Sequence, residues 1–293
     1  MIICNFQDDL REYIIKSFLA NNCINWDPNK SFDDLLMDYS NWRIRIILDK
    51  KRKIVMSPII NPPHEHFEGC MSLIKLIVNG DNINPYLSDK IRDIKYQDKM
   101  LYDWGIYHFH LGNRKPNGTI ARTNILLFAR VTDSHVYFIQ YLKHGEWHNT
   151  ELIEAIHQYW PDTIADRRIR NVHDIEPKLD GTIRHTLRKK NVNSLYQTTD
   201  GTVYAMLGGG LSTAGTSSYA TLWAIKLMKD IESKERYFDQ NSESIMKMLV
   251  EKGQAGNQDV RCCWDVENDE YLIRNLSGNG SLGNEVLLRM NFK

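Results

Sequence analysis

Hydrophobic residues near the start of the chain recur at the spacing of an α-helix. Residues 6–20 carry an apolar stripe on one face, which predicts an amphipathic helix. Residues 31–39 predict a shorter helix, with Ser31 as its N-cap and two acidic residues close behind it. Residues 67–78 predict a third helix, which the Asn-Gly pair at 79–80 ends. The first stripe consists of Phe6, Leu10, Tyr13, Ile14 and Phe18.

Between the second and third helices the pattern changes to apolar and basic residues in alternation. Residues 42–48 therefore predict a strand, and a charged turn joins it to a second apolar run at residues 54–60. The resulting hairpin places Arg43 and Arg45 on the same face. We interpret the charged turn as solvated rather than as a contact to nucleic acid.

The segment from Trp104 to Trp160 is the one around which the rest of the chain is organised. Its first part, residues 104–111, alternates with a period of two and predicts a strand. Two histidines share one face of that strand, and their α-carbons are about 6.6–7 Å apart at the rise of a β-strand. One face carries Trp104, Ile106, His108 and His110, and the other carries Tyr107, Phe109 and Leu111.

Two further strands and a helix follow in the same segment. Residues 125–131 are apolar on both faces, as expected of a central strand. A two-residue turn at 133–134 predicts a hairpin with residues 135–143. Residues 151–160 predict a helix that Asn149 or Thr150 caps. The predicted facing pairs of the hairpin are Arg130 with Tyr137 and Phe128 with Ile139.

The remainder of the chain is basic at first and then rich in strand signals. Periodicity does not decide whether residues 162–200 are a linker, an arm or a surface helix. A hairpin with its turn at 200–201 follows, and then a helix from Ser217 or Ser218 to about residue 235. The strands predicted after it cover VRCCWDV, EYLIRNL and a closing VLLRMNF.

These elements predict an α+β fold, an antiparallel sheet with packed helices followed by a β-rich C-terminal region. We expect residues 1–190 to form an α+β domain with a central histidine-rich sheet. Residues 191–293 are then a β-rich region with one helix, which is either a second domain or completes the first sheet. The glycine-rich segment 208–218 matches neither nucleotide-binding fingerprint and is interpreted as a loop.

Composition narrows the classes of function. The 293 residues contain 37 Lys+Arg and 37 Asp+Glu, so the formal charge of zero excludes a globally basic nucleic-acid binder and leaves a local basic face possible. No apolar run reaches the roughly 18 residues of a membrane span, and the N-terminus does not have the pattern of a signal peptide. An odd number of scattered cysteines predicts reduced, buried thiols and a cytoplasmic protein. The cysteines are Cys4, Cys23, Cys70, Cys262 and Cys263.

Histidine is concentrated in the central segment, where five of the ten fall between residues 108 and 148. Its imidazole exchanges protons near neutral pH and is the commonest metal ligand. The alternative for His108 or His110 is a hydrogen-bonded core histidine. A metal site needs a further ligand from His144, His148 or Asp103, and the chain has no HExxH motif. The pair at 64 and 66 supplies only two ligands.

A site without metal or cofactor requires fewer coincidences, because acid–base and cationic groups are already close in sequence. We assign catalysis to His108, His110, Arg130, His144 and His148. We assign substrate binding to Arg114, Lys115, Lys143 and Trp147.

Residues 124–147, NILLFARVTDSHVYFIQYLKHGEW, resemble the strand–turn–strand core of RelE/ParE-type toxins. The resemblance covers some 25 to 55 of the 293 residues. It implies ribosome-associated mRNA cleavage, in which a ribose 2′-hydroxyl is positioned to attack its own phosphate. Arg130 matches the basic strand residue of that family, and Lys143, His144 and His148 match its tail.

The sequence thus favours a toxin-like, RNA-directed nuclease of a bacterial defence or toxin–antitoxin system, with metal-independent acid–base cleavage. One alternative is a metal-dependent hydrolase that uses the same histidines. Another is a non-catalytic defence or assembly protein that acts through protein–protein interfaces, so whether the chain is an enzyme stays open. The expected partners are RNA or another nucleic acid, and a protein or a second copy of the chain, but no membrane.

Overall fold

The computed structural model describes residues 1–20, 27, 29–61, 63–172, 174–253, 255, 259–276 and 282–288, with backbone alone from residue 275 on. Cys23 and the last residues of the expected closing strand lie outside this part of the chain. The contacts divide the chain into two compact units. One comprises Met1–Tyr39 and Leu222–Lys293, and the other comprises Ser40–Thr221.

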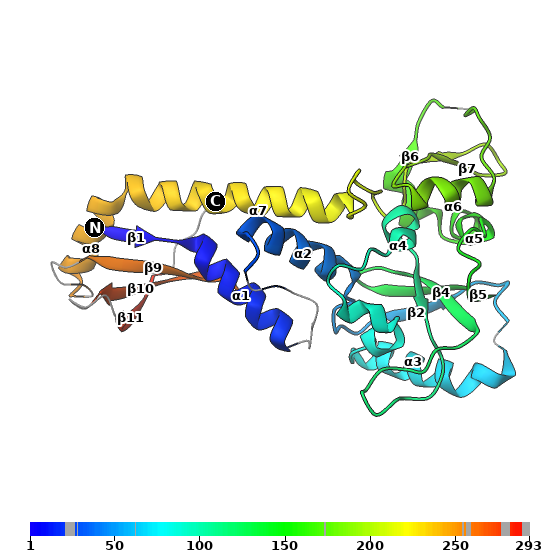
Figure 1. Ribbon diagram of the computed structural model, residues 1–293, viewed down its shortest axis with the longest axis horizontal. Coiled ribbons are helices and arrows are strands. Elements are labelled where there is room, and N and C mark those ends of the chain that lie inside the picture. Colours follow the sequence, from blue (N-terminus) through cyan, green and yellow to red (C-terminus); the bar gives the residue numbers. More distant parts are fainter. Residues whose placement is uncertain are drawn as a thin grey trace. The chain divides into compact units, whose positions relative to one another are not determined.

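The unit Ser40–Thr221 is built on a four-stranded sheet with the order β2-β5-β4-β3 (Figure 1). Strand β3 pairs antiparallel with β4, and β4 pairs antiparallel with β5. Strand β2 lies parallel to β5 at the edge. The strands are β2 (Lys53–Met56), β3 (Tyr107–Phe109), β4 (Ile125–Val131) and β5 (His135–Lys143).

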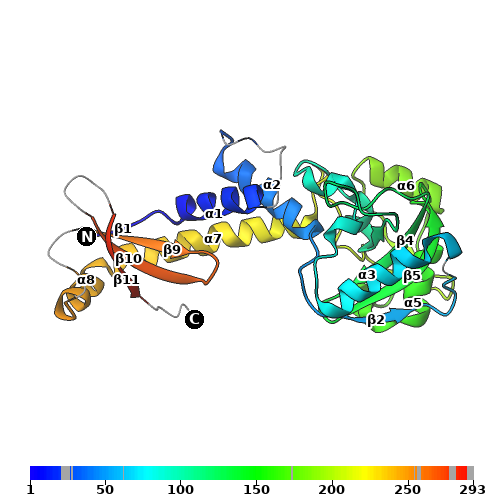
Figure 2. The ribbon, with the colours of Figure 1, turned by 90° about the horizontal axis from the view of Figure 1, so that it is seen from below.

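A helix covers each face of this sheet. Successive side chains of β4 point to opposite faces and therefore pack into two different cores. Leu127 and Ala129 pack into the core that α3 (Phe67–Asn79) closes, whereas Leu126 and Phe128 pack into the core that α5 (Glu151–Tyr159) closes. Figure 1 shows α3 below the sheet and α5 above it, and Figure 2 places α3 in front. The apolar run of 125–131 is therefore a central strand, as predicted.

The β4–β5 hairpin has the predicted register near its turn and a different one further along. Arg130 faces Tyr137, as expected. The register then shifts between Phe128 and Ala129, so that Phe128 faces Gln140 and not Ile139. The pairing predicted for Phe128 is wrong because β5 contains one extra residue, a β-bulge, which an ideal two-residue alternation does not anticipate.

The prediction of a strand at residues 42–48 is also wrong, because the helix α2 (Phe32–Arg45) continues through most of these residues. Arg45 is buried there, and its guanidinium donates to the carbonyls of Asn41, Lys90 and Asp93 at 3.3, 3.2 and 2.7 Å. No hairpin forms, and β2 pairs with β5 instead. The start of α2 is as predicted, since Ser31 Oγ accepts from the Asp34 amide at 3.2 Å.

The basic segment 162–200 contains regular elements and is not a linker. A small sheet of order β6-β8-β7 includes the hairpin that was predicted around residues 200–201, with Tyr196 facing Tyr204. The other elements of this unit are η1 (His64–His66), η2 (Asn84–Tyr86), η3 (Asp89–Arg92), α4 (Lys99–Trp104), η4 (Pro161–Arg167), β6 (Arg168–Ile169), α6 (Gly181–Lys189), β7 (Tyr196–Gln197) and β8 (Val203–Tyr204).

The other unit joins the two ends of the described chain in one sheet of order β1-β9-β10-β11. Strand β1 is parallel to β9, and the helices α1 and α7 run side by side (Figure 2). The ring of Phe6 on α1 lies 5.7 Å from Phe238 on α7 and 5.5 Å from Tyr271 on β10. The elements are β1 (Ile2–Cys4), α1 (Phe6–Ala20), α7 (Ser218–Gln240), α8 (Ser242–Glu251), β9 (Val260–Asp265), β10 (Glu270–Leu276) and β11 (Leu282–Leu288).

The predicted α+β class is confirmed, with mostly antiparallel sheets, packed helices and a strand-rich C-terminal region. The division by contacts differs from the boundary expected at residue 190, which falls inside the unit Ser40–Thr221. The pairing of β1 with β9 produces this difference, because local patterns carry no information on which distant strands pair. None of the described helices is long and apolar enough to cross a membrane.

Candidate functional site

A cavity of about 290 Å³ in the unit Ser40–Thr221 brings together four of the residues singled out in the sequence. His108 belongs to β3 and His110 follows it, while His144 and Trp147 lie in the segment after β5. The strand predicted over residues 104–111 is shorter in the structure, because Trp104 ends α4 and β3 covers only Tyr107–Phe109, but His108 and His110 lie close together as predicted. His144 returns toward β4, because its amide donates to the carbonyl of Asn124 at 2.6 Å.

The rings of these residues form a continuous cluster. The centroid of His110 lies 6.2 Å from that of His108 and 6.3 Å from that of His144. Trp147 closes the cluster, with its ring 4.9 Å from His108 and 5.2 Å from His144. The cavity therefore has an aromatic wall that also carries groups able to exchange protons.

The hydrogen bonds and surroundings of His110 define its chemical form. Its Nδ1 accepts from the amide of Thr123 at 3.2 Å, so the neutral ring carries its proton on Nε2. Burial, and then the nearby His108, Arg122 and His144, lower the pKa of His110 to about 4. His110 is thus a neutral imidazole at neutral pH, able to donate a hydrogen bond from Nε2.

His108 is buried, with 9% of its surface exposed. Burial is the main cause that lowers the pKa of His108; Asp98 opposes it, and the neighbouring His144 and Arg122 lower the pKa further. At neutral pH its unprotonated form is therefore favoured. A neutral imidazole of this kind can accept a proton from a reacting hydroxyl.

Three buried nitrogens around this cavity have no hydrogen-bond partner among the described residues. They are Nδ1 of His108, Nδ1 of His185 and Nη2 of Arg188. A buried polar atom without a partner costs about 1–3 kcal/mol, so proteins rarely bury several together. Three residues that line this cavity thus carry a polar atom that the described residues leave unsatisfied.

The charged residues that line the cavity are mostly cationic. Lys90, Lys99, Arg122 and Arg188 face a single lining carboxylate, Asp98. Asp98 is engaged as the N-cap of α4, where it accepts from the Leu101 amide at 3.1 Å. Such a balance favours an anionic ligand.

The other predicted site residues do not line this cavity. Arg130 donates to the carbonyl of Thr163 at 2.7 Å. Lys115 forms an ion pair with Asp89 at 2.8 Å, and Arg114 donates to the Gly118 carbonyl at 2.9 Å. Lys143 and His148 are exposed. His108, His110, His144 and Trp147 thus converge in space, whereas His148 and the four predicted cationic residues do not.

Sequence reasoning missed Arg122, His185 and Arg188. The last two lie on α6, whose buried positions are Arg184 and Arg188 rather than apolar residues. Hydrophobic periodicity in the sequence does not reveal a helix whose buried residues are arginines. The available signal was its cap, since Asp180 accepts from the Ile183 amide at 2.8 Å.

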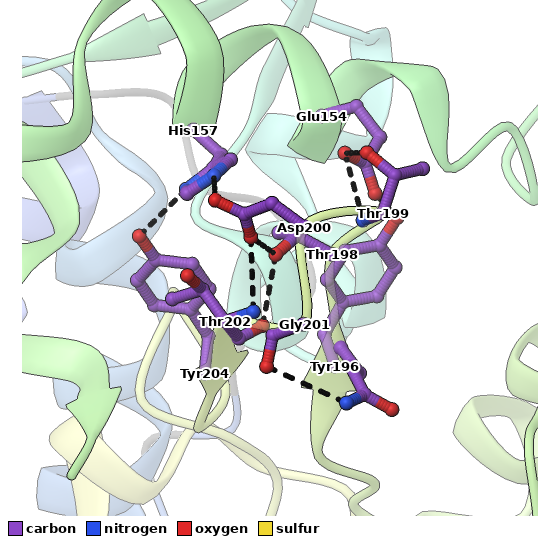
Figure 3. Close-up of polar contacts among 10 residues, drawn as sticks. Glu154, His157, Tyr196, Thr198, Thr199, Asp200, Gly201, Thr202 and Tyr204 are labelled. Atoms are coloured by element: carbon purple, nitrogen blue, oxygen red, sulfur yellow. Dashed lines mark hydrogen bonds and ion pairs between the residues drawn. The ribbon is translucent and has the colours of Figure 1, made fainter. Parts of the chain in front are cut away.

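His157, in the same unit, has a different environment from the histidines of the cavity (Figure 3). His157 on α5 bonds through Nδ1 to the hydroxyl of Tyr204 at 2.9 Å and through Nε2 to Asp200 at 3.0 Å. Asp200 also accepts from the Thr198 hydroxyl at 2.6 Å and from the Thr202 amide at 2.9 Å. Both ring nitrogens are satisfied by these contacts, and the cluster joins α5 to the β7–β8 hairpin.

No group of three or more His, Cys, Asp or Glu side chains in the described part of the chain is arranged to hold a metal ion. His64 and His66 lie in η1, where His66 is 3.5 Å from Glu65.

No known protein family, curated protein or solved structure matches this chain. The resemblance of residues 124–147 to RelE/ParE-type toxins stays a prediction.

Proposed function

We propose that this chain is an RNA-directed nuclease that cleaves the phosphodiester backbone by general acid–base chemistry, with the cavity of His108, His110 and His144 as its active site. The observation that carries the proposal is the convergence of these rings with unpartnered buried nitrogens and cationic side chains. Phosphodiester cleavage without a metal uses a base, an acid and groups that stabilise negative charge on the phosphate, and the histidines and cationic side chains supply these types.

Each group has a role in the proposed reaction. His108 accepts the proton of a ribose 2′-hydroxyl, and the 2′-oxygen attacks the adjacent phosphorus. The bond from phosphorus to the 5′-oxygen breaks, and that leaving oxygen takes a proton from His144. The products are a 2′,3′-cyclic phosphate and a 5′-hydroxyl. His110 donates from Nε2 to a phosphate oxygen, and Arg188 and Arg122 stabilise the developing negative charge.

The wider setting of this proposal is a bacterial defence or toxin–antitoxin system in the cytoplasm. Its support is the resemblance to RelE/ParE-type toxins, together with four described cysteines that are free thiols. Expression of the wild type then slows growth and degrades cellular RNA, and the His108→Gln variant does neither.

The direct test is cleavage of a labelled single-stranded RNA by the purified protein in the presence of a metal chelator. We expect His108→Gln and His144→Gln to reduce the rate about 10²- to 10⁴-fold, the usual contribution of a positioned acid or base. His64→Gln is the matched control, because His64 is exposed in η1 and does not line the cavity. Wild-type protein without cleavage, or variants as active as the wild type, would refute the proposal.

A further inference from the structure

The helix α6 carries an unusual amount of buried positive charge. Arg184 and Arg188 lie one turn apart and are only 4% and 3% exposed. Arg184 bonds to neutral acceptors alone, the carbonyls of Leu179 and Leu195 and the hydroxyl of Ser194. Arg188 has one carboxylate partner, Asp103. Of these two guanidinium groups, that of Arg188 is the one that lines the cavity, together with Lys90, Lys99 and Arg122.

Arg188 is held in one orientation by contacts on three sides. Its Nε donates to Asp103 at 2.8 Å, and its Nη1 donates to the carbonyl of Trp147 at 2.9 Å. Its guanidinium carbon lies 4.0 Å from the centre of the Trp104 ring. Nη2 has no partner among the described residues, although Arg188 lines the cavity. An arginine fixed in this way loses little conformational entropy when Nη2 binds a ligand.

The neighbouring histidines respond to the same positive field. After burial, Lys189 and Arg188 are the main causes that lower the pKa of His185. Arg122 likewise lowers the pKa of His110. A bound anion opposes these effects, so its binding is favoured by several groups at once.

We propose that Arg188 and His185 form a phosphate-binding subsite of this cavity, which anchors a phosphate group of a nucleotide ligand. This inference deepens the proposed function and rests on the same cavity. Nη2 of Arg188 offers two N–H donors and His185 offers Nδ1, which suits an anion with several acceptor oxygens. The cavity of about 290 Å³ extends from this subsite to the ring of Trp147, on which a base can stack.

The test is calorimetric binding of adenosine, adenosine 5′-monophosphate, inorganic phosphate and a dinucleoside phosphodiester to the full chain. We expect the monophosphate to bind about tenfold or more tightly than adenosine, as for a charge-assisted hydrogen bond. Binding of inorganic phosphate shows that the subsite takes a terminal phosphate, and a preference for the dinucleotide shows that it takes an internal one.

The variant that isolates the subsite is Asp103→Asn with Arg188→Gln, which removes both charges of the pair together and so protects the fold. We expect this double variant to bind adenosine and its monophosphate equally, while its circular dichroism is unchanged. His185→Ala weakens the phosphate preference in part, and Arg170→Gln, an exposed control on the same unit, leaves it intact.

Two outcomes separate this inference from the proposed function. A phosphate preference that depends on Arg188, in a protein that does not cleave RNA, supports the subsite and refutes the nuclease. The subsite is overturned if the wild type binds adenosine as tightly as its monophosphate, or if the double variant keeps the preference.

Discussion

Two histidines of the same unit, His157 and His108, differ in what their ring nitrogens contact. Both nitrogens of His157 are hydrogen-bonded, to Tyr204 and to Asp200. Nδ1 of the more deeply placed His108 has no partner in the described part of the chain. A satisfied polar cluster stabilises a fold, whereas an unsatisfied one stores a cost that a ligand can offset. On the proposed function, His157 serves the structure and His108 serves a ligand.

The largest effect is expected from the ion pair between Asp103 and Arg188, because Arg188 lines the cavity of His108. Asp103→Ala leaves the charge of Arg188 buried without a carboxylate, and we expect the free energy of unfolding to fall by about 3–5 kcal/mol. Urea denaturation monitored by tryptophan fluorescence measures this change in the free energy of unfolding. Asp103→Ala combined with Arg188→Met is the matched control and should recover much of the loss. A single variant within about 1 kcal/mol of the wild type would mean that the pair does not sustain the cavity.

A smaller effect is expected at the satisfied cluster. Tyr204 is buried, so His157→Ala leaves its hydroxyl without its ring partner, and we expect a loss of about 1–3 kcal/mol in the free energy of unfolding. His157→Ala with Tyr204→Phe removes both polar groups and should be closer to the wild type. RNA cleavage should be unchanged in both variants. A loss of cleavage with normal stability would reverse the assignment of the two histidines.

A third effect, which appears only at acidic pH, is the dependence of stability on pH. The pKa of His110 is lowered to about 4 in the folded state, below the ordinary value of about 6.5. The unfolded chain therefore takes up a proton first as the pH falls. The stability linked to His110 is complete above pH of about 6.5 and is lost between there and pH of about 4. His110→Gln should flatten this part of the profile of melting temperature against pH, whereas His64→Gln should not.

The sequence predicted those elements in which one face is apolar and the other polar. The stripe of Phe6, Leu10, Ile14 and Phe18 is buried on α1, and Gly80 ends α3 in the left-handed conformation. Period-two alternation also brought His108 and His110 to the same cavity. This success came from local geometry, which fixes the direction of a side chain relative to its neighbours two residues away.

The failures arose where burial involves polar side chains or distant pairing. Arg45 and Arg188 are buried through backbone carbonyls and a carboxylate that lie far away in sequence. Their helices therefore lack the expected apolar signal at those positions. The predicted cationic residues do not reach the cavity, because Arg114 donates to the nearby Gly118 carbonyl and Lys115 pairs with Asp89. Residue types in the sequence thus indicated the kind of chemistry. Tertiary contacts determine which of the histidine, arginine and lysine residues line the cavity.

The pairing of β1 with β9 has a consequence for synthesis of the chain. The ammonium group of Met1 contacts Asp259 at 2.7 Å across a separation of 258 residues, and the strand that β1 needs emerges from the ribosome late. Residues Ser40–Thr221 form a continuous unit, so all their internal partners are available earlier. The unit Ser40–Thr221, which contains the histidine cavity, lies in sequence between the two segments of the other unit and can therefore fold first. The residues of β1 pair only after β9 has been synthesised.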